Sequence, residues 1–227
     1  MRRQQSRPAR ARCMPIRQGS AAVPSDEELT KRLYARALGD RLIITPLLSP
    51  VIHGGGIDIR LGTKFITGRR TQYTSFNPLD VDAEQALSMQ RRSQIAFDGK
   101  FVLHPDQLAL ASSLEYICLP RDLAASVVTR STFGRAGLLG ATAVFVHPGF
   151  RGCLTLELLN LGEVPIELRP GMRIAQLVFL VHGGTDEPRA GKYCMATEPE
   201  FPKFWEDSDR EVLRRIDLAA RRRQEGG

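Results

Sequence analysis

Between Leu42 and Leu180 the chain is divided into short aliphatic runs, and this texture limits its possible folds more than any other feature of the sequence. Gly, Pro, Asp and Asn separate the runs. The runs cover residues 56–61, 101–103, 109–119, 141–146, 152–160, 165–168 and 172–181. Many short strands with frequent turns are typical of a β-barrel or a β-sandwich and not of a parallel α/β sheet. We therefore expect a mainly β fold with few helices.

Three segments carry helical signals instead. The first begins at Ser25, which forms a capping box with Glu28, and its expected end is Gly39. Residues 121–137 fit a helix in two pieces around residues 129–132. Residues 206–223 fit a polar helix whose thin apolar stripe consists of Val212, Ile216 and Ala220. These helices flank or interrupt the β region and do not alternate with its strands.

The charge of the chain is unevenly distributed. The net charge is +7, but six arginines precede the first acidic residue, Asp26. The remainder is close to neutral, so we expect no nucleic-acid-binding face. No apolar run approaches the ~20 residues needed to cross a bilayer, so we expect no membrane partner.

These patterns divide the chain into three parts: a basic leader at 1–24, one domain at 25–205 and a helical basic tail at 206–227. The leader is rich in Arg, Gln, Ser and Pro and has no apolar periodicity, which predicts disorder. It fits a flexible basic arm, an Arg-rich targeting segment, or an upstream extension before a true start at Met14.

The four cysteines, Cys13, Cys118, Cys153 and Cys194, show no CxxC or CxxH spacing. We therefore expect free thiols in a reduced, cytoplasmic protein. A zinc-dependent nucleobase deaminase needs a paired Pro-Cys-x-x-Cys, so zinc is not expected here. The sequence also contains no G-x-S-x-G nucleophile motif, no P-loop and no Rossmann glycine pattern.

Residues 129–137, Thr-Arg-Ser-Thr-Phe-Gly-Arg-Ala-Gly, form the first candidate cluster. Hydroxyl groups precede a short helical turn, and the free N–H groups at a helix start bind phosphate. Arg130 and Arg135 add forked donors that suit phosphate or carboxylate. Ser131 and Arg135 are four residues apart, so they share one face of a helical turn. The alternative is a capping serine followed by a solvated arginine.

Residues 152–160 form the second cluster. Three leucines alternate with Cys153, Thr155 and Glu157, which is the periodicity of a strand. Glu157 therefore lies in an otherwise apolar strand, where a carboxylate is costly unless it is paired or used. Such a carboxylate suits a general base. The alternative is an ordinary glutamate that faces outward from a half-exposed strand.

In their order and spacing, these segments resemble the dCTP deaminase branch of the dUTPase superfamily. The resemblance runs from Leu29 to Tyr193. It rests on residues 56–62 (GIDIRLG), 103–105 (LHP), 119–123 (LPRDL), 130–138 (RSTFGRAGL), 148–152 (PGFRG), 154–157 (LTLE) and 169–177 (RPGMRIAQL).

The resemblance implies a distorted, mostly antiparallel β-barrel of the dUTPase-like type, which assembles as a homotrimer with its active sites at subunit interfaces. It implies deamination of dCTP to dUTP and ammonia without zinc, with Mg²⁺ accompanying the triphosphate. A glutamate of such enzymes activates water for attack on C4 of cytosine, while a serine and an arginine arrange the site. By position, Glu157 would be the general base, Ser131 would hold the water or the base, and Arg135 would orient Glu157.

The resemblance also implies a set of substrate-binding residues: Arg130, Thr132, Phe133, Gly134, His147, Thr155, Leu156 and Lys192. Arg130 and the backbone of residues 131–134 would lie near the phosphates, and Lys192 would contact a phosphate from the C-terminal side. Thr155 and Leu156 would line the pocket for the base, and His147 would stand at the sugar.

Several positions depart from the family pattern. His147 replaces an aspartate that contacts the sugar in deaminases and helps to activate water in dUTPases. A lone histidine is more often structural than catalytic. The loop at 137–148 is one residue shorter than in the commonest deaminases, and Thr185 stands where a tyrosine is expected. After Lys192 the expected glutamine is missing, as is the glycine-rich C-terminal arm of dUTPases.

Three functions therefore remain to be distinguished. The first is dCTP deaminase, which requires Ser131, Arg135 and Glu157. The second is a dUTPase or a bifunctional deaminase–diphosphatase, against which His147 counts. The third is a non-catalytic nucleotide-binding regulator, which the altered sugar-side and C-terminal positions suggest.

Overall fold

The computed structural model describes residues 23–48, 52–78, 80–140, 145–183, 192–207 and 209–225, with side chains to Ala219 in the last range. Nearly all of the expected leader lies outside the described residues, as do Cys13, Thr185 and residues 141–144 of one expected strand. No helix in the described ranges is both long and apolar enough to span a membrane.

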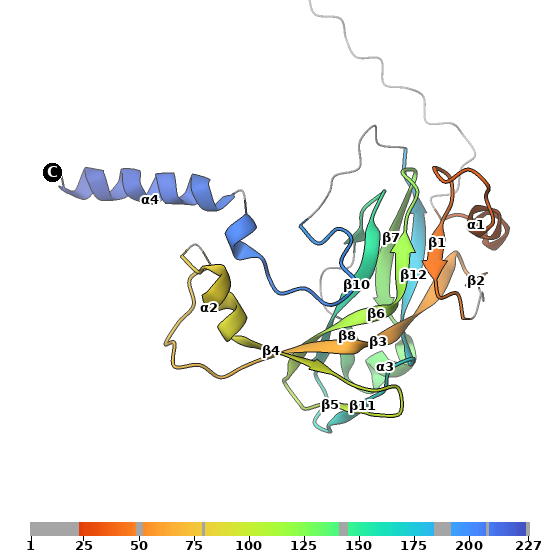
Figure 1. Ribbon diagram of the computed structural model, residues 1–227, viewed down its shortest axis with the longest axis horizontal. Coiled ribbons are helices and arrows are strands. Elements are labelled where there is room, and N and C mark those ends of the chain that lie inside the picture. Colours follow the sequence, from red (N-terminus) through yellow and green to blue (C-terminus); the bar gives the residue numbers. More distant parts are fainter. Residues whose placement is uncertain are drawn as a thin grey trace, which may run out of the picture.

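A single curled antiparallel sheet dominates the molecule (Figure 1). Its strands follow the order β8 (Leu138–Gly140), β10 (Arg151–Asn160), β6 (Leu108–Cys118), β3 (Gly56–Gly68), β12 (Arg173–Val181), β7 (Leu123–Thr129) and β9 (Phe145–Val146). Short strands extend it: β1 (Ile43–Thr45) pairs with β6, while β2 (Ile52–His53) and β4 (Gln90–Gln94) pair with β3. A separate pair consists of β5 (Phe101–Leu103) and β11 (Ile166–Leu168). The expected mainly β, distorted antiparallel barrel is confirmed.

The hydrophobic core fills the inside of the curl. Alternation along β10 directs Leu154, Leu156 and Leu158 inward, where each is at most 7% exposed. Phe65 and Phe179 are its largest fully buried side chains, at 1% and 0% exposed. Fully burying a side chain of this kind stabilises the fold by about 1.5–3 kcal/mol. The strands are thereby fixed in register, and the residues between the leucines face outward.

Helix α1 (Asp26–Leu33) begins where the sequence predicts. The Ser25 hydroxyl accepts a hydrogen bond from the Glu28 N–H at 3.2 Å, and Leu29 and Leu33 are buried against the core. The helix ends at Leu33, however, and not near Gly39. Ala37 is exposed, so no apolar contact extends the helix beyond its second turn.

The helix expected at 121–137 is wrong in its first half, because residues 123–129 form strand β7. Strand β7 pairs with β12 along its whole length and with β9 at Ala125 and Ser126. These ladders, with the β-branched residues at 127–129, outweigh the helical propensity of the alanines before them. The second half of the prediction is right, since α3 (Ser131–Arg135) is a short helix.

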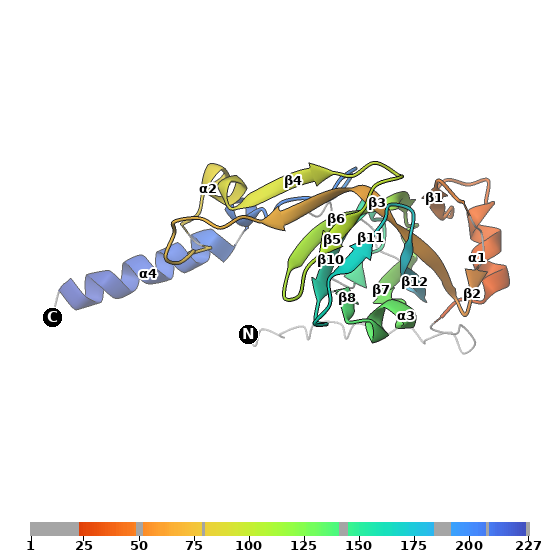
Figure 2. The same cartoon turned by 90° about the horizontal axis from the view of Figure 1, so that it is seen from below.

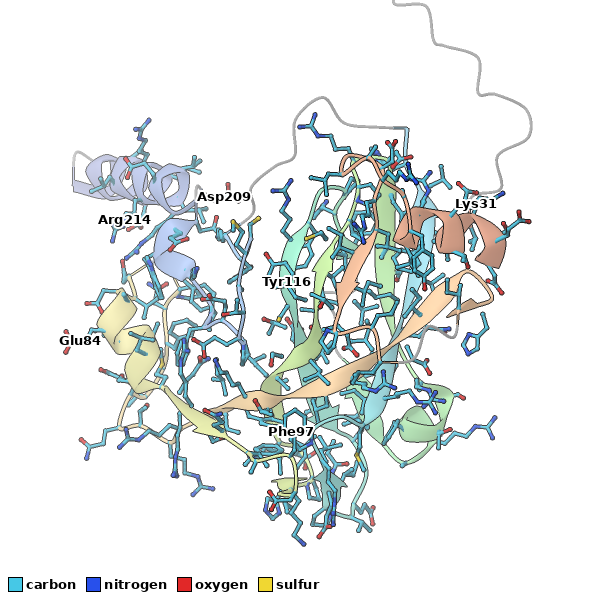
Figure 3. All side chains as sticks on the ribbon, turned by 45° about the vertical axis from the view of Figure 1, so that its right-hand side comes forward. Lys31, Glu84, Phe97, Tyr116, Asp209 and Arg214 are labelled. Atoms are coloured by element: carbon cyan, nitrogen blue, oxygen red, sulfur yellow. The ribbon has the colours of Figure 1, made fainter. Side chains whose placement is uncertain are left out.

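The remaining helices lie at one end of the molecule. Helix α2 (Ala83–Ser88) precedes β4, and a 3₁₀ turn (Phe204–Glu206) leads into α4 (Asp209–Glu225). Figures 1 and 2 show α4 projecting away from the barrel. In Figure 3, Asp209 and Arg214 on α4 lie near Glu84 of α2, far from Lys31 on α1. The basic helix expected at 206–223 therefore exists with slightly shifted bounds.

Residues 192–207, here called the C-terminal strap, return across the barrel to reach α4. The Met195 N–H donates to the Arg151 carbonyl at 2.6 Å, and the Cys153 N–H donates to the Ala196 carbonyl at 2.7 Å. Farther along, Glu198 pairs with Lys64 at 3.1 Å. These contacts attach the strap to the outer edge of β10 and to β3.

Candidate functional site

A cleft of about 780 Å³ opens on the outer face of the sheet beside β10. The ends of β3 and β6 and the turn at 145–150 form parts of its wall, and the C-terminal strap contributes Tyr193, Cys194 and Glu200. Glu157, Thr155 and His147 all line this cleft. The structure thus brings together three of the predicted site residues, which come from two separate motifs.

Glu157 owes its position to strand alternation. It lies on β10 opposite Leu110 of β6, between the inward-facing Leu156 and Leu158. Its side chain is half-buried, and the cleft that it lines also holds apolar residues such as Leu108 of the neighbouring strand β6 and Phe145 of β9. A carboxylate on the wall of a cleft can exchange a proton with a bound ligand.

The other cleft residues contribute in different ways. His147 is exposed, and its ring meets the Phe145 ring edge-on at 5.0 Å. The Thr155 hydroxyl accepts a hydrogen bond from the Glu200 N–H at 3.4 Å, which connects β10 to the strap. The Leu156 side chain is only 4% exposed and packs in the core, so any contact of Leu156 with a base would involve its main chain.

The α3 cluster lies elsewhere on the same copy of the chain. Ser131, Thr132, Gly134 and Arg135 are exposed, and Phe133 is half-buried. The Arg130 carbonyl accepts from the N–H groups of Phe133 and Gly134, at 2.9 and 3.1 Å, which closes the short turn. Within the described ranges, no residue from 130 to 135 lines the cleft that holds Glu157. One copy of the chain therefore does not assemble all the predicted site residues.

Arg130 is fixed by two residues that sequence reasoning missed. Its Nε lies 3.7 Å from Oδ1 of Asp58, and its Nη1 donates to the Arg173 carbonyl at 3.2 Å. Nη1 of Arg173 lies 3.2 Å from Oδ2 of the same Asp58. The available signal was Asp58 itself, a charged residue between two isoleucines of a predicted strand.

Lys192 is engaged within its own chain. Its Nζ lies 2.8 Å from Oδ2 of Asp207, and this hydrogen bond raises the pKa of Lys192 and lowers the pKa of Asp207. Lys192 does not itself line the cleft, although the adjacent Tyr193 and Cys194 do. Tyr193 and Glu200 are cleft residues that the sequence analysis did not identify, because the strap carries no periodic pattern.

In the described part of the chain, no group of three or more His, Cys, Asp or Glu side chains is arranged to hold a metal ion. Cys118, Cys153 and Cys194 are free thiols. Burial is the main cause that raises the pKa of the Cys153 thiol, which keeps it in its neutral form at neutral pH.

Comparisons with known proteins show which family the chain belongs to. A family model described as dCTP deaminase-like matches residues 24–181. The protein named dCTP deaminase, dUMP-forming, from Halobacterium salinarum is 40% identical over 196 residues, covering 82% of this chain and 97% of that protein. Its namesake from Methanosphaera stadtmanae is 33% identical over 197 residues, covering 83% and 96%. The dCTP deaminase of Halorubrum lacusprofundi is 36% identical over 160 residues, covering 69% and 76%.

A solved structure supports the same fold. The crystal structure of 2'-deoxycytidine 5'-triphosphate deaminase from Agrobacterium tumefaciens superposes with a TM-score of 0.52 at 24% identity, covering 69% of this chain and 45% of that chain. This likeness concerns the fold. Together with the family model and the relatives, it leads to one conclusion: the chain belongs to the dCTP deaminase-like family.

Proposed function

We propose that this protein deaminates dCTP to dUTP and ammonia, with Glu157 as the proton-transferring base. The observation that carries the proposal is the half-buried position of Glu157 in a cleft of about 780 Å³, large enough for a nucleotide, on a chain of this family. The names of the relatives support dCTP as the substrate.

The reaction requires proton movements that one carboxylate can perform. Glu157 takes a proton from water as the water oxygen bonds to C4 of the cytosine ring. Glu157 passes this proton to N3 of the ring, and then carries the proton of the new C4 hydroxyl group to the amino group. The C4–N bond breaks, ammonia leaves, and C4 keeps a carbonyl oxygen. Positioned proton transfer of this kind contributes roughly 10²–10⁴ in rate.

The complete site needs a second copy of the chain. Ser131 and Arg135 are exposed on α3 and do not line the Glu157 cleft of their own copy. In a homotrimer, α3 of one subunit covers the cleft of the next, so that Ser131 holds the water or the base. Arg135 then orients Glu157, because a guanidinium group can hold a carboxylate with charge-assisted hydrogen bonds.

The substrate is proposed to be the magnesium complex of dCTP. Arg130 and the 131–134 backbone, including Thr132, Phe133 and Gly134, receive the phosphates. His147 contacts the sugar, Thr155 and the Leu156 main chain contact the base, and Lys192 reaches a phosphate after leaving Asp207. Magnesium retains water and phosphate ligands readily, so it needs no cage of protein carboxylates.

The test is turnover with its products identified. Purified protein is incubated with dCTP and Mg²⁺, and dUTP and ammonia are measured. We expect Glu157→Gln to lose activity by at least about 10²-fold while dCTP still binds. Binding of dCTP without any turnover by the wild-type chain contradicts the proposal and favours the non-catalytic regulator.

A mixing experiment tests the shared site. Glu157→Gln and Arg135→Ala subunits, each inactive alone, are unfolded and refolded together. If the site joins two copies, some interfaces in mixed trimers carry both intact halves, and activity returns. Absence of any recovery in verified mixed trimers shows that Glu157 and Arg135 of different copies do not share a site.

A second candidate function is further hydrolysis of dUTP to dUMP and pyrophosphate. It is favoured by the relatives from Halobacterium salinarum and Methanosphaera stadtmanae, which are named dUMP-forming. His147 counts against it, since the dUTPase aspartate is missing there. Pyrophosphate released in step with ammonia, and abolished by His147→Ala, establishes this activity. dUTP as the only nucleotide product excludes it.

A further inference from the structure

The carboxylate of Asp58 lies between two guanidinium groups on the side of the barrel that carries α3. Asp58 belongs to β3, Arg173 to the adjacent β12, and Arg130 follows the end of β7, the next strand along. Each oxygen of Asp58 faces a different arginine, Arg173 at 3.2 Å and Arg130 at 3.7 Å. Three neighbouring strands therefore converge on one acidic side chain.

The carboxylate and the two guanidinium groups differ in their exposure to solvent. The Asp58 side chain is only 12% exposed, whereas Arg130 and Arg173 are 34% and 44% exposed. The carboxylate is thus inside the cluster and the guanidinium groups are at its rim. One negative charge against two positive charges leaves the rim positive and facing solvent.

Arg130 is held by more than the carboxylate. Its Nη1 donates to the Arg173 carbonyl at 3.2 Å, and its backbone N–H donates to the Ile174 carbonyl at 3.0 Å. Together with Asp58 these contacts restrict a long side chain that otherwise samples many rotamers. Preorganised arginine loses less conformational entropy when it binds an anion.

We propose that Asp58 is a positioning residue that holds Arg130 and Arg173 as a paired receptor for the substrate triphosphate, with Arg173 as a phosphate contact in addition to Arg130. This inference rests on the proposed function for the identity of the anion. Asp58 acts through the arginines and touches no substrate atom. A triphosphate carries several negative charges, so a second guanidinium beside Arg130 matches it better than one.

Asp58→Asn separates positioning from simple charge. The substitution keeps the size of the side chain and makes the cluster more positive, so charge alone predicts tighter binding of an anion. Positioning predicts the opposite, because a neutral amide in place of the carboxylate cannot pair with both guanidinium groups. We expect affinity for inorganic tripolyphosphate to fall about tenfold, as for the loss of a charge-assisted contact.

The probe is tripolyphosphate, measured by titration calorimetry on the full chain, with and without Mg²⁺. It does not depend on deamination, so failure of the proposed activity and failure of this inference are distinguishable. Glu167→Gln is the matched control, since it removes one carboxylate from the exposed pair with Lys100 and should leave affinity unchanged. Wild-type protein that binds no tripolyphosphate, or Asp58→Asn protein that binds it equally or more tightly, overturns the inference.

A double-mutant cycle distinguishes positioning from a general structural effect. In an Arg130→Met, Arg173→Met background, Asp58→Asn should have no further effect on tripolyphosphate affinity, because no guanidinium remains to be positioned. An undiminished effect there rejects the positioning role. If Asp58→Asn fails to fold, Arg173→Met tests the paired receptor instead, because the Arg173 side chain is 44% exposed. Loss of this guanidinium group should weaken tripolyphosphate binding several-fold. Unchanged affinity contradicts the paired receptor.

Discussion

The buried pair of Glu115 and Arg60 makes fold stability depend on pH in a way that one substitution should reveal. Glu115 lies on β6 and is 2% exposed. Its Oε2 accepts from the Arg60 N–H at 2.9 Å, and its Oε1 lies 3.6 Å from Nη1 of Arg60, whose side chain is 15% exposed. Burial is the largest cause that raises the pKa of Glu115 above its usual value of 4.5, and Arg60 opposes this rise.

Arg60→Met removes the opposing charge but keeps the backbone N–H. Removing one partner of a buried ion pair costs about 3–5 kcal/mol of stability. Because Arg60 is partly exposed, we expect its removal to cost about 3 kcal/mol. Without Arg60, the folded-state pKa of Glu115 rises further. The stability that comes from the neutral carboxyl is fully present below its unfolded pKa and is lost as the pH rises through the folded pKa. The penalty of Arg60→Met should therefore be largest at neutral pH and smallest near the usual glutamate pKa of 4.5.

The measurement is urea unfolding of wild-type and variant protein at about pH 5 and about pH 7.5, compared as differences in the free energy of unfolding. Lys31→Met, in the exposed pair of Lys31 and Glu27 at 2.7 Å, is the control and should change little at either pH. An equal loss at both pH values for Arg60→Met refutes the reasoning, because it shows that Glu115 does not titrate in response to its partner.

Two further predictions concern a buried amide and the strap. Asn160 is 0% exposed, and its side chain makes three hydrogen bonds of 2.9 to 3.0 Å. Asn160→Ala should therefore lower the free energy of unfolding in urea by about 2–3 kcal/mol. A loss below about 1 kcal/mol contradicts this account. Asp207→Asn removes the ion pair that holds Lys192 at 2.8 Å, so Lys192 becomes available to the triphosphate. The KM for dCTP should then fall a few-fold with little change in kcat. An unchanged or higher KM shows that Asp207 does not compete with the triphosphate for Lys192.

The parts of the fold that sequence predicted well are those in which one face of a strand is buried. The expected strand at 152–160 differs from β10 by one residue, because its alternation of leucines with polar residues reports directly on two different faces. Strand β4, in contrast, reads Gln-Arg-Arg-Ser-Gln and lies at a sheet edge. No apolar alternation marks it, so it was not predicted.

The bounds of strand β3 and the existence of helix α2 could not be predicted correctly from local sequence signals. The expected strand at 56–61 continues through Gly62 as β3. A Cβ at Gly62 would lie 2.4 Å from Ser112 Oγ, so this glycine allows close approach of β6 and does not end the strand. Helix α2 was missed although Asp82 and Gln85 form a capping box, because its six residues are too few for a periodic pattern.

The sequence could predict which residues belong to the candidate site, but not how they are arranged relative to one another. Glu157, Thr155 and His147 come from neighbouring motifs and share a cleft. Ser131 and Arg135 lie on α3, outside that cleft, and their relation to Glu157 depends on how copies associate, which no periodicity within one chain encodes. Asp58 was overlooked because its partners are more than 70 residues away, at Arg130 and at Arg173.

The C-terminal strap has a consequence for how the protein is made. Tyr193, Cys194 and Glu200, which close one wall of the cleft, follow the last strand of the sheet in the chain. During synthesis the barrel strands therefore leave the ribosome before the residues that complete the cleft. A nascent chain that has already folded its sheet still lacks a finished cleft, and a chain truncated after β12 should keep the barrel but bind nucleotide poorly.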